Sequence, residues 1–220
     1  MHRKSKQDTS ENQQKNNVIV IATGASLTAD DCAIAEKKAD IIAIKEAYRL
    51  LPNASFIYGC DADFWDSEQE VYAHSAKKYT QCKKTADKYG LEWVHCWQNE
   101  QKAIREGVIA PAPHDKHKFS FNPAYICSGY NSGFQAINLA ILLGYNRIGL
   151  LGFDMGITQG GDTHFFGKRD IGRNVNSPYA LFAKTLDNNA DWLKQNNIEV
   201  INCSRMSALS AYERRVIDDF

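Results

Sequence analysis

The chain has 220 residues, of which 44% are hydrophobic, and 26 Lys and Arg balance 26 Asp and Glu. This length favours one domain with a substantial core, and the balanced charge provides no global field that would recruit nucleic acid or an anionic membrane. No apolar run approaches the roughly 18 residues of a membrane span, the N-terminus has no secretion-signal core, and the six cysteines form no C-x-x-C pair, which together predict a cytoplasmic protein with reduced thiols.

The N-terminal part of the chain predicts a polar tail followed by a Rossmann-like start. Residues 1–16 are polar and aperiodic, so we expect a disordered tail before a single domain at 17–220. The β-branched run at 18–22 predicts a central parallel strand, followed by a small-residue turn and a helix on which Thr28 and Asp31 form a variant capping box. The turn is not a full dinucleotide fingerprint, so NAD is not expected.

Further strands at 40–44 and 55–60 alternate with helices, which predicts an α/β, Rossmann-like fold with a mostly parallel sheet flanked by helices. Asp61 and Asp63 follow the third strand. In an extended segment they would share a face and could hold Mg²⁺ carrying a nucleotide diphosphate. Alternatively, Asp63 or Asp66 caps a helix at 67–76. Next we expect strands at 77–81 and 91–96 around a helix at 83–89.

The most informative stretch is residues 125–154, YICSGYNSGFQAINLAILLGYNRIGLLGFD. A small-residue turn opens a helix that ends at Gly144, and an apolar run at 147–153 predicts a buried parallel strand. The unpaired amides of such a turn suit a phosphate or carboxylate, and Asp154 stands where open α/β sheets place their ligands. This turn, which contains Ser128, Gly129, Asn131 and Ser132, therefore predicts an anion site.

Residues 155–177 lack periodicity and have the length of a functional lid. Within this lid, His164 is a candidate general base toward a hydroxyl, and the basic residues Lys168, Arg169 and Arg173 are candidates for a phosphate or the acceptor. A helix at 178–195, a strand at 198–203 and a short C-terminal helix complete the predicted chain.

The order of these features resembles the bacterial sialyltransferases that have a single Rossmann-like domain and a lid, and that transfer sialic acid from its cytidine monophosphate ester. The resemblance covers roughly residues 17–210 and is carried by VIVIATGASL at 18–27, the stretch at 125–155, THFFG at 163–167 and IEVINCSRMSAL at 198–209. The chain is also similar to archaeal 6-hydroxymethylpterin diphosphokinase-like proteins and to uncharacterised phage and prophage proteins.

The resemblance implies roles for particular residues. The first turn would contact the donor phosphate or ribose, the second turn would line the nucleotide site, and His164 would deprotonate the acceptor hydroxyl. Such a reaction requires no metal cofactor, and Lys168 and Arg169 would offset the charge of the leaving phosphate. The kinship also implies a homo-oligomer. The residues implied for the first turn are Gly24, Ala25 and Ser26.

Two positions depart from the family pattern. The first turn usually reads Gly-x-Gly-Pro-Ser-Leu, whereas this chain has Ala25 within Thr23–Leu27. Lys45 stands where an asparagine that contacts the donor is common. We expect Lys45 either to bind a phosphate or to mark a changed donor.

Three functional hypotheses follow. The first is a sialyltransferase-like glycosyltransferase that uses a CMP-sugar or similar nucleotide-activated donor and an acceptor glycan or other hydroxyl compound, with His164 and Asp154 as its catalytic residues. The second is a Mg²⁺-dependent diphosphokinase acting on a small alcohol through Asp61 and Asp63. The third is a non-catalytic phage accessory or binding protein. Modified DNA is a further possible acceptor, which the basic lid residues would contact.

Overall fold

The structure, a computed structural model, describes residues 17–167 and 178–220. The tail predicted at 1–16 and the lid residues 168–177 lie outside the described residues. The strands are β1 (Asn17–Ile21), β2 (Asp40–Ile44), β3 (Phe56–Gly59), β4 (Lys77–Thr80), β5 (Glu92–Trp93), β6 (Cys96–Trp97), β7 (Ile126–Cys127), β8 (Arg147–Leu151), β9 (Glu199–Asn202) and β10 (Glu213–Arg214).

Helices alternate with these strands along most of the chain. They are α1 (Ala29–Lys38), α2 (Ala62–Ser67), α3 (Lys83–Tyr89), α4 (Glu100–Arg105), α5 (Ser132–Leu142), α6 (Tyr179–Asp187) and α7 (Ala190–Gln195), with 3₁₀ helices η1 (Lys45–Leu50), η2 (Gln69–Ala73) and η3 (Ile217–Asp219). None of the described helices is both long and apolar enough to cross a membrane.

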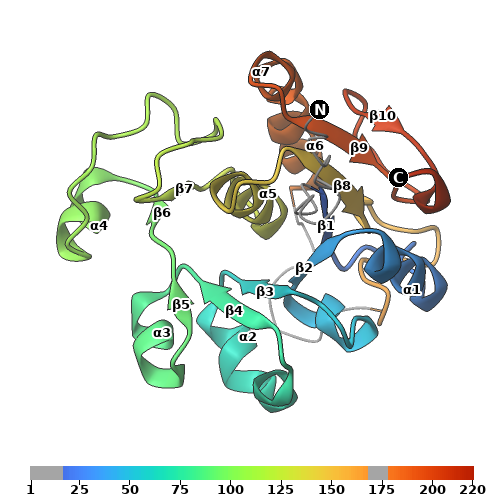
Figure 1. The fold of residues 1–220 in the computed structure, drawn as a ribbon, viewed down its shortest axis with the longest axis horizontal. Helices are drawn as coiled ribbons and strands as arrows, with labels where there is room; N and C mark the ends of the chain where they lie inside the picture. Colours follow the sequence, from blue (N-terminus) through green and yellow to red (C-terminus); the bar gives the residue numbers. More distant parts are fainter. Residues whose placement is uncertain (1–16, 168–177) are drawn as a thin grey trace, which may run out of the picture.

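Eight strands form one sheet in the order β10-β9-β8-β1-β2-β3-β4-β5, and every strand pairing in it is parallel. The chain first builds outward from β1 to β5 and later adds β8 on the other side of β1 (Figure 1). The strand order therefore reverses between β1 and β8, where open α/β sheets bind ligands beyond their carboxyl ends. The predicted α/β, Rossmann-like fold is confirmed.

Both faces of the sheet are covered, which explains the continuous apolar runs in its strands. Successive side chains of a strand point to opposite faces. Accordingly, Val18 and Val20 of β1 join an apolar cluster that includes α5, α6 and α7, while Ile19 and Ile21 join a second cluster that includes α1, η1 and α2. The sheet is the middle layer between these helices (Figure 1).

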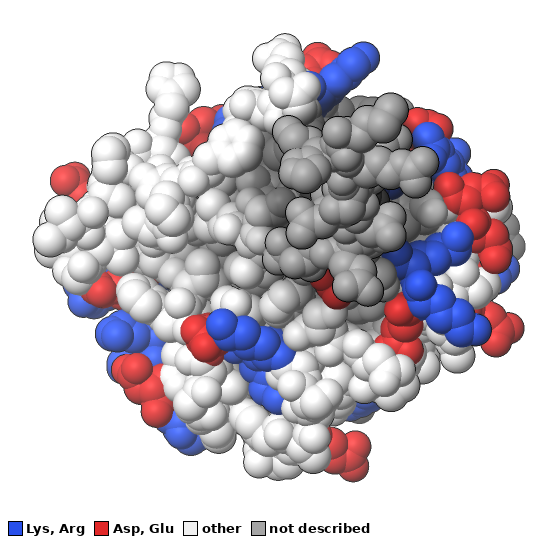
Figure 2. Space-filling model, viewed as in Figure 1, with Lys and Arg blue, Asp and Glu red and all other residues white. Residues whose placement is uncertain are grey.

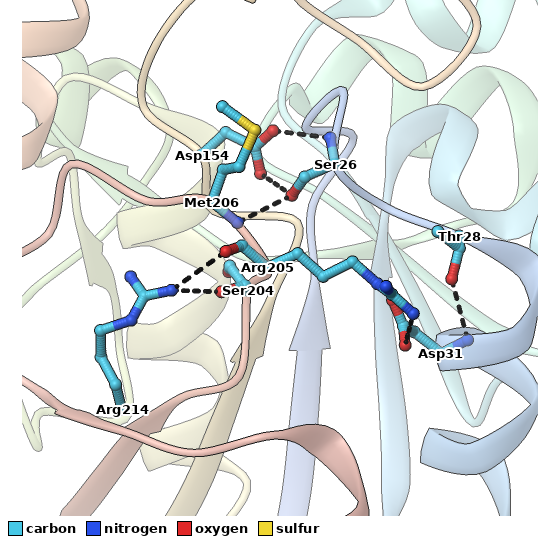
Figure 3. A network of polar contacts seen from close by, with 8 residues as sticks. All are labelled: Ser26, Thr28, Asp31, Asp154, Ser204, Arg205, Met206 and Arg214. Atoms are coloured by element: carbon cyan, nitrogen blue, oxygen red, sulfur yellow. Dashed lines mark hydrogen bonds and ion pairs between the residues drawn. The ribbon is translucent and has the colours of Figure 1, made fainter.

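The first helix begins as predicted but uses its acidic residue differently. Thr28 Oγ1 accepts a hydrogen bond from the Asp31 amide at 3.1 Å, so Thr28 is the N-cap of α1. The Asp31 carboxylate does not close a capping box. The carboxylate instead accepts hydrogen bonds from the Arg205 guanidinium at 2.6 and 3.0 Å, which tie α1 to the chain after β9 (Figure 3). Burial raises the pKa of Asp31, but the hydrogen bonds outweigh this effect, so the pKa is lowered.

The single helix predicted at 178–195 is wrong, because the chain breaks between α6 and α7. Asparagine side chains compete with the helical backbone for hydrogen bonds. Here the buried Asn189 amide group donates to the carbonyl oxygens of Thr185 at 2.7 Å and His117 at 2.9 Å. The break therefore anchors the segment around His117 to this pair of helices.

Two other predicted elements also differ. The strand expected at 91–96 divides, because β5 joins the main sheet whereas β6 pairs with β7 in a small second sheet. The expected C-terminal helix is limited to the short 3₁₀ helix η3, and the edge strand β10 precedes it. The amides of Ser210 and Ala211 donate to the Asp187 carboxylate, which holds this segment extended as it approaches β10.

Candidate functional site

A cleft of about 590 Å³ lies at the carboxyl ends of the parallel strands. Much of its wall consists of residues that directly follow a strand, such as Lys45 after β2 and Cys60 after β3. The first turn of α5, the described part of the lid and the start of α6 supply further wall residues. Because this position is the strand-order switch, the cleft is the candidate functional site.

Gly24 lets the turn after β1 approach the end of β8. Its amide donates to the Gly152 carbonyl at 2.9 Å. A Cβ at position 24 would lie 2.4 Å from both this carbonyl oxygen and Asp154 Oδ1. Such separations are far below van der Waals contact, so a side chain at this position would force the two strand ends apart.

Asp154 braces that same turn. Its Oδ2 accepts from the Ser26 amide and its Oδ1 from the Ser26 hydroxyl, both at 2.7 Å (Figure 3). Ser26 Oγ in turn accepts from the Met206 amide at 3.3 Å. Asp154 is only 9% exposed, and although it lines the cleft, both carboxylate oxygens are engaged within the protein. These contacts support a structural role for Asp154, and the catalytic role expected from the sequence stays a prediction.

The cleft wall includes Gly24, whereas Ala25 and Ser26 are not among the residues that line it. Ser26 directs both its amide and its hydroxyl toward Asp154, so in this arrangement it shapes the turn without facing a ligand. The unusual Ala25 accordingly lies outside the cleft wall. Thr23 and Gly24 are the residues of this turn that the cleft exposes to a ligand.

The turn before α5 supplies backbone amides. Asn131 is the N-cap, since its Oδ1 accepts from the Phe134 amide at 2.9 Å, and its carbonyl accepts from the amide of Gln135. The first four amides of a helix have no intrahelical acceptor. Asn131 accepts hydrogen bonds from the amides of Phe134 and Gln135 but not from those of Ser132 and Gly133. Ser132 and Gly133 both line the cleft, where such amides suit an anion.

The four nucleotide-site residues predicted in this turn do not all reach the cleft. Ser128, Asn131 and Ser132 line it, whereas Gly129 does not. Gly129 has a φ of 51°, and a Cβ there would lie 1.9 Å from Phe134 Cγ, so this glycine allows the turn to fold over the helix.

Lys45 and Asp61 form an ion pair in the cleft, from Lys45 Nζ to Asp61 Oδ2. The Lys45 side chain is 13% exposed and that of Asp61 is 42% exposed. Lys45 follows β2 with a φ of 50°, a left-handed conformation that is uncommon for a residue with a side chain. The backbone thus holds a cation at the carboxyl edge of the sheet, where it can offset the charge of a phosphate.

The carboxylate pair does not fit the predicted Mg²⁺ site. Asp61 precedes α2 as its N-cap residue without capping through its side chain, and Asp63 lies in the first helical turn, so the segment is not extended as the metal hypothesis requires. Asp66 also lies within α2, and no helix spans 67–76. Lys45 is paired with Asp61, and the described residues include no cluster of three or more His, Cys, Asp or Glu suited to a metal ion.

The lid brings His164 to the cleft. Its Nδ1 lies 2.8 Å from Thr23 Oγ1, and its ring stacks on Phe166 with centroids 5.0 Å apart. The lid backbone is fixed by paired hydrogen bonds between His164 and Gly167, and by a bond from the Phe165 amide to the Thr23 carbonyl at 3.0 Å. Thr23 therefore positions both the backbone and the imidazole of this part of the lid.

The basic lid residues expected from the sequence, Lys168, Arg169 and Arg173, lie outside the described residues. The cleft residues that were not singled out from the sequence include Thr23, which contacts the lid, Gln81 after β4 and Gln98 after β6. The only available signal for them was their position just past a strand. For Gln98 even that signal was weak, because β6 has two residues.

Cys60, another wall residue that follows β3, contacts the second turn. Its Sγ lies 2.9 Å from Ser132 Oγ. Burial is the largest influence on this thiol and raises its pKa, which the nearby Lys45 partly opposes. The group is therefore a neutral thiol at neutral pH, suited to packing and hydrogen bonding rather than to nucleophilic attack.

Backbone strain is concentrated in the cleft. Among the described residues other than glycine, those with a left-handed φ are Lys45, Tyr130, Met155 and Asn197, and the first three line the cleft. Such conformations persist where the surrounding structure enforces them, and they cluster at functional sites. This distribution supports the cleft as the functional site independently of its chemistry.

Comparisons with known proteins found no matching family model, curated protein or solved structure. The resemblance to sialyltransferases accordingly rests on the sequence features alone. A fold does not determine a function, so the function depends on the residues of the cleft.

Proposed function

We propose that this chain is a transferase that uses a nucleotide-activated donor, and that it catalyses a sialyltransferase-like glycosyl transfer. The observation that carries the proposal is the 2.8 Å contact between His164 and Thr23, which places an imidazole beside the Gly24 turn in the cleft that α5 also enters. One cleft thereby combines a proton acceptor with amides and a lysine suited to phosphate.

In the proposed reaction, an acceptor hydroxyl oxygen bonds to the anomeric carbon of the donor sugar while the bond from that carbon to the phosphate oxygen breaks. His164 takes the hydroxyl proton, and the nucleotide monophosphate leaves with the bonding electron pair. If Thr23 accepts from Nδ1–H, the proton-accepting lone pair of the neutral ring is on Nε2. The Ser132 and Gly133 amides and Lys45 are suited to stabilising the departing phosphate.

The alternatives receive less support. Diphosphate transfer requires Mg²⁺, for which the ion-paired Asp61 and helical Asp63 are poorly arranged. For a DNA acceptor, a continuous basic surface would be expected. On the face drawn in Figure 2, the described Lys and Arg residues are instead interspersed with Asp and Glu. Under the non-catalytic hypothesis, the contact between His164 and Thr23 would serve only to anchor the lid.

The test is a thermal-shift panel of CMP, CDP, UDP, GDP, ADP and ATP, each with and without Mg²⁺, on the wild type and His164→Ala. A nucleotide at 100 times its Kd stabilises the native state by about 2.7 kcal/mol, or roughly 5–10 °C for a chain of this size. We expect metal-independent stabilisation of both proteins, and sugar transfer by the wild type only. Stabilisation by ATP with Mg²⁺ alone would favour diphosphate transfer, and no stabilisation would favour the non-catalytic hypothesis.

A further inference from the structure

Tyr130 adopts a costly conformation within the cleft. Its φ is 67°, in the left-handed region where a bulky side chain is an outlier. A glycine would adopt this conformation without strain, so the turn does not need an aromatic residue to fold. Yet the residue lines the cleft and is 49% exposed, which means that burial in the core does not explain its side chain either.

The Tyr130 ring is held flat by a second ring. It stacks on His117 with centroids 3.9 Å apart and an angle of 20° between the planes. Burial lowers the pKa of His117, so the imidazole is neutral at neutral pH and forms an uncharged backing. With one face of the tyrosine covered by His117, the opposite face is the one that can meet a ligand.

This pair of rings is anchored from two sides. The His117 carbonyl accepts from the buried Asn189 side chain at 2.9 Å, which ties it to the break between α6 and α7. The adjacent Lys116 carbonyl accepts from the Gly129 amide at 3.3 Å, which ties it to the turn before α5. The tyrosine is therefore preorganised, and a ligand that stacks on it would not have to order a mobile side chain.

The position of the ring relative to the phosphate-binding amides suggests its ligand. Tyr130 is two residues before Ser132, so their Cα atoms are at most about 7 Å apart, close to the span of a ribose between its phosphate and its base. β7 leads through this turn directly into α5 (Figure 1). A nucleotide with its phosphate at the start of α5 could therefore place its base beside Tyr130.

We propose that Tyr130, backed by His117, is the stacking platform for the base of the bound nucleotide. This inference rests on the proposed function, because it assumes a nucleotide whose phosphate lies at the start of α5. Stacking uses the π-face that every base has, so the platform provides affinity for the base without choosing among bases. The donor site would thus bind the nucleoside by stacking, independently of the contacts that bind the phosphate.

The experiment measures the Kd values of CMP, UMP, AMP and GMP, and of ribose 5-phosphate, which lacks a base. The proteins are the wild type, Tyr130→Phe, Tyr130→Ala and, as a matched control, Phe121→Ala. Phe121 is 52% exposed, packs against Trp192 and does not line the cleft. Unfolding curves without ligand verify that each variant is folded.

We expect Tyr130→Ala to raise the Kd of the tightest-binding mononucleotide by about 5- to 150-fold, while Tyr130→Phe and Phe121→Ala keep the Kd of the wild type. Ribose 5-phosphate should bind equally to all four proteins. Equal nucleotide affinity of wild type and Tyr130→Ala, or an equal loss for ribose 5-phosphate, would overturn the platform alone. If Tyr130→Ala does not fold, loss of affinity in Tyr130→Phe would also contradict it. A wild type that binds none of the mononucleotides would overturn both the platform and the proposed function.

Discussion

Replacing Asp154 by alanine tests whether this residue is a brace or a catalytic group. The structure gives its carboxylate two hydrogen bonds of 2.7 Å, from the amide and the hydroxyl of Ser26. A hydrogen bond to a charged group contributes about 1.5–3 kcal/mol, so Asp154→Ala should lower the free energy of unfolding by about 3–6 kcal/mol. Ser26→Ala keeps the hydrogen bond from the amide and removes the one from the hydroxyl, so the free energy of unfolding should fall by about half as much.

The assay is urea unfolding followed by circular dichroism for Asp154→Ala, Ser26→Ala, the double variant and the exposed control Asp87→Ala. Once Asp154 is absent, removing the Ser26 hydroxyl should cost only the longer hydrogen bond that it accepts from the Met206 amide at 3.3 Å. The double-mutant cycle should therefore give a coupling energy of about 1.5–3 kcal/mol, and the control should change stability by less than about 0.5 kcal/mol. A coupling near zero, with activity lost and stability unchanged, would refute the brace and restore the catalytic interpretation.

Further predictions concern the turn, the lid and the pH dependence of stability. Gly24→Ala should lower the free energy of unfolding by about 2–4 kcal/mol, because the new Cβ would lie 2.4 Å from two oxygen atoms. The control Gly160→Ala should be tolerated, because its Cβ has no neighbour closer than 3.7 Å. Equal unfolding midpoints of the two variants would contradict this prediction. Thr23→Val should lower kcat about 10- to 100-fold by releasing His164, without changing nucleotide affinity, and a wild-type kcat would count against the oriented base. Burial lowers the pKa of His95 in the folded state, so the unfolded state binds the proton first, and stability should fall as the pH drops from about 7 to about 5.5. His95→Gln should weaken this pH dependence, and an unchanged slope in urea unfolding would contradict the assignment.

Much of the fold was predictable because the main strands have a strong and local signal. The β-branched run at 18–22 predicted β1, and the segment at 40–44 coincides with β2. Elements that depend on distant partners were not predictable. β6 and β7 have two residues each and exist because they pair with each other, while the break before α7 depends on a bond from Asn189 to His117.

The site was predictable in position and less so in the roles of its residues. A strand end identified the turn of Gly24, whereas Lys45 was noted from the family pattern and His164 from the aperiodic lid; all three line the cleft. Whether a side chain faces a ligand depends on which partner it meets in the folded chain. Ser26 meets Asp154 across 128 positions of sequence, and no local pattern predicts such a contact. Tyr130 was missed because a strained backbone conformation has no signature in a residue with a side chain.

Asp154 and His164 contact the same turn, and under the proposed function His164 is the one that acts on the substrate. Asp154 holds Ser26, and three residues earlier Thr23 holds both the lid backbone and the imidazole. A loss of the brace should therefore reach the lid through the turn, so Asp154→Ala should reduce both stability and kcat. Thr23→Val removes only the side-chain contact to His164, so it should reduce kcat without reducing stability. Comparing the two variants distinguishes Asp154, which stabilises the turn, from Thr23, which orients His164. The comparison of stability against kcat holds for any acceptor.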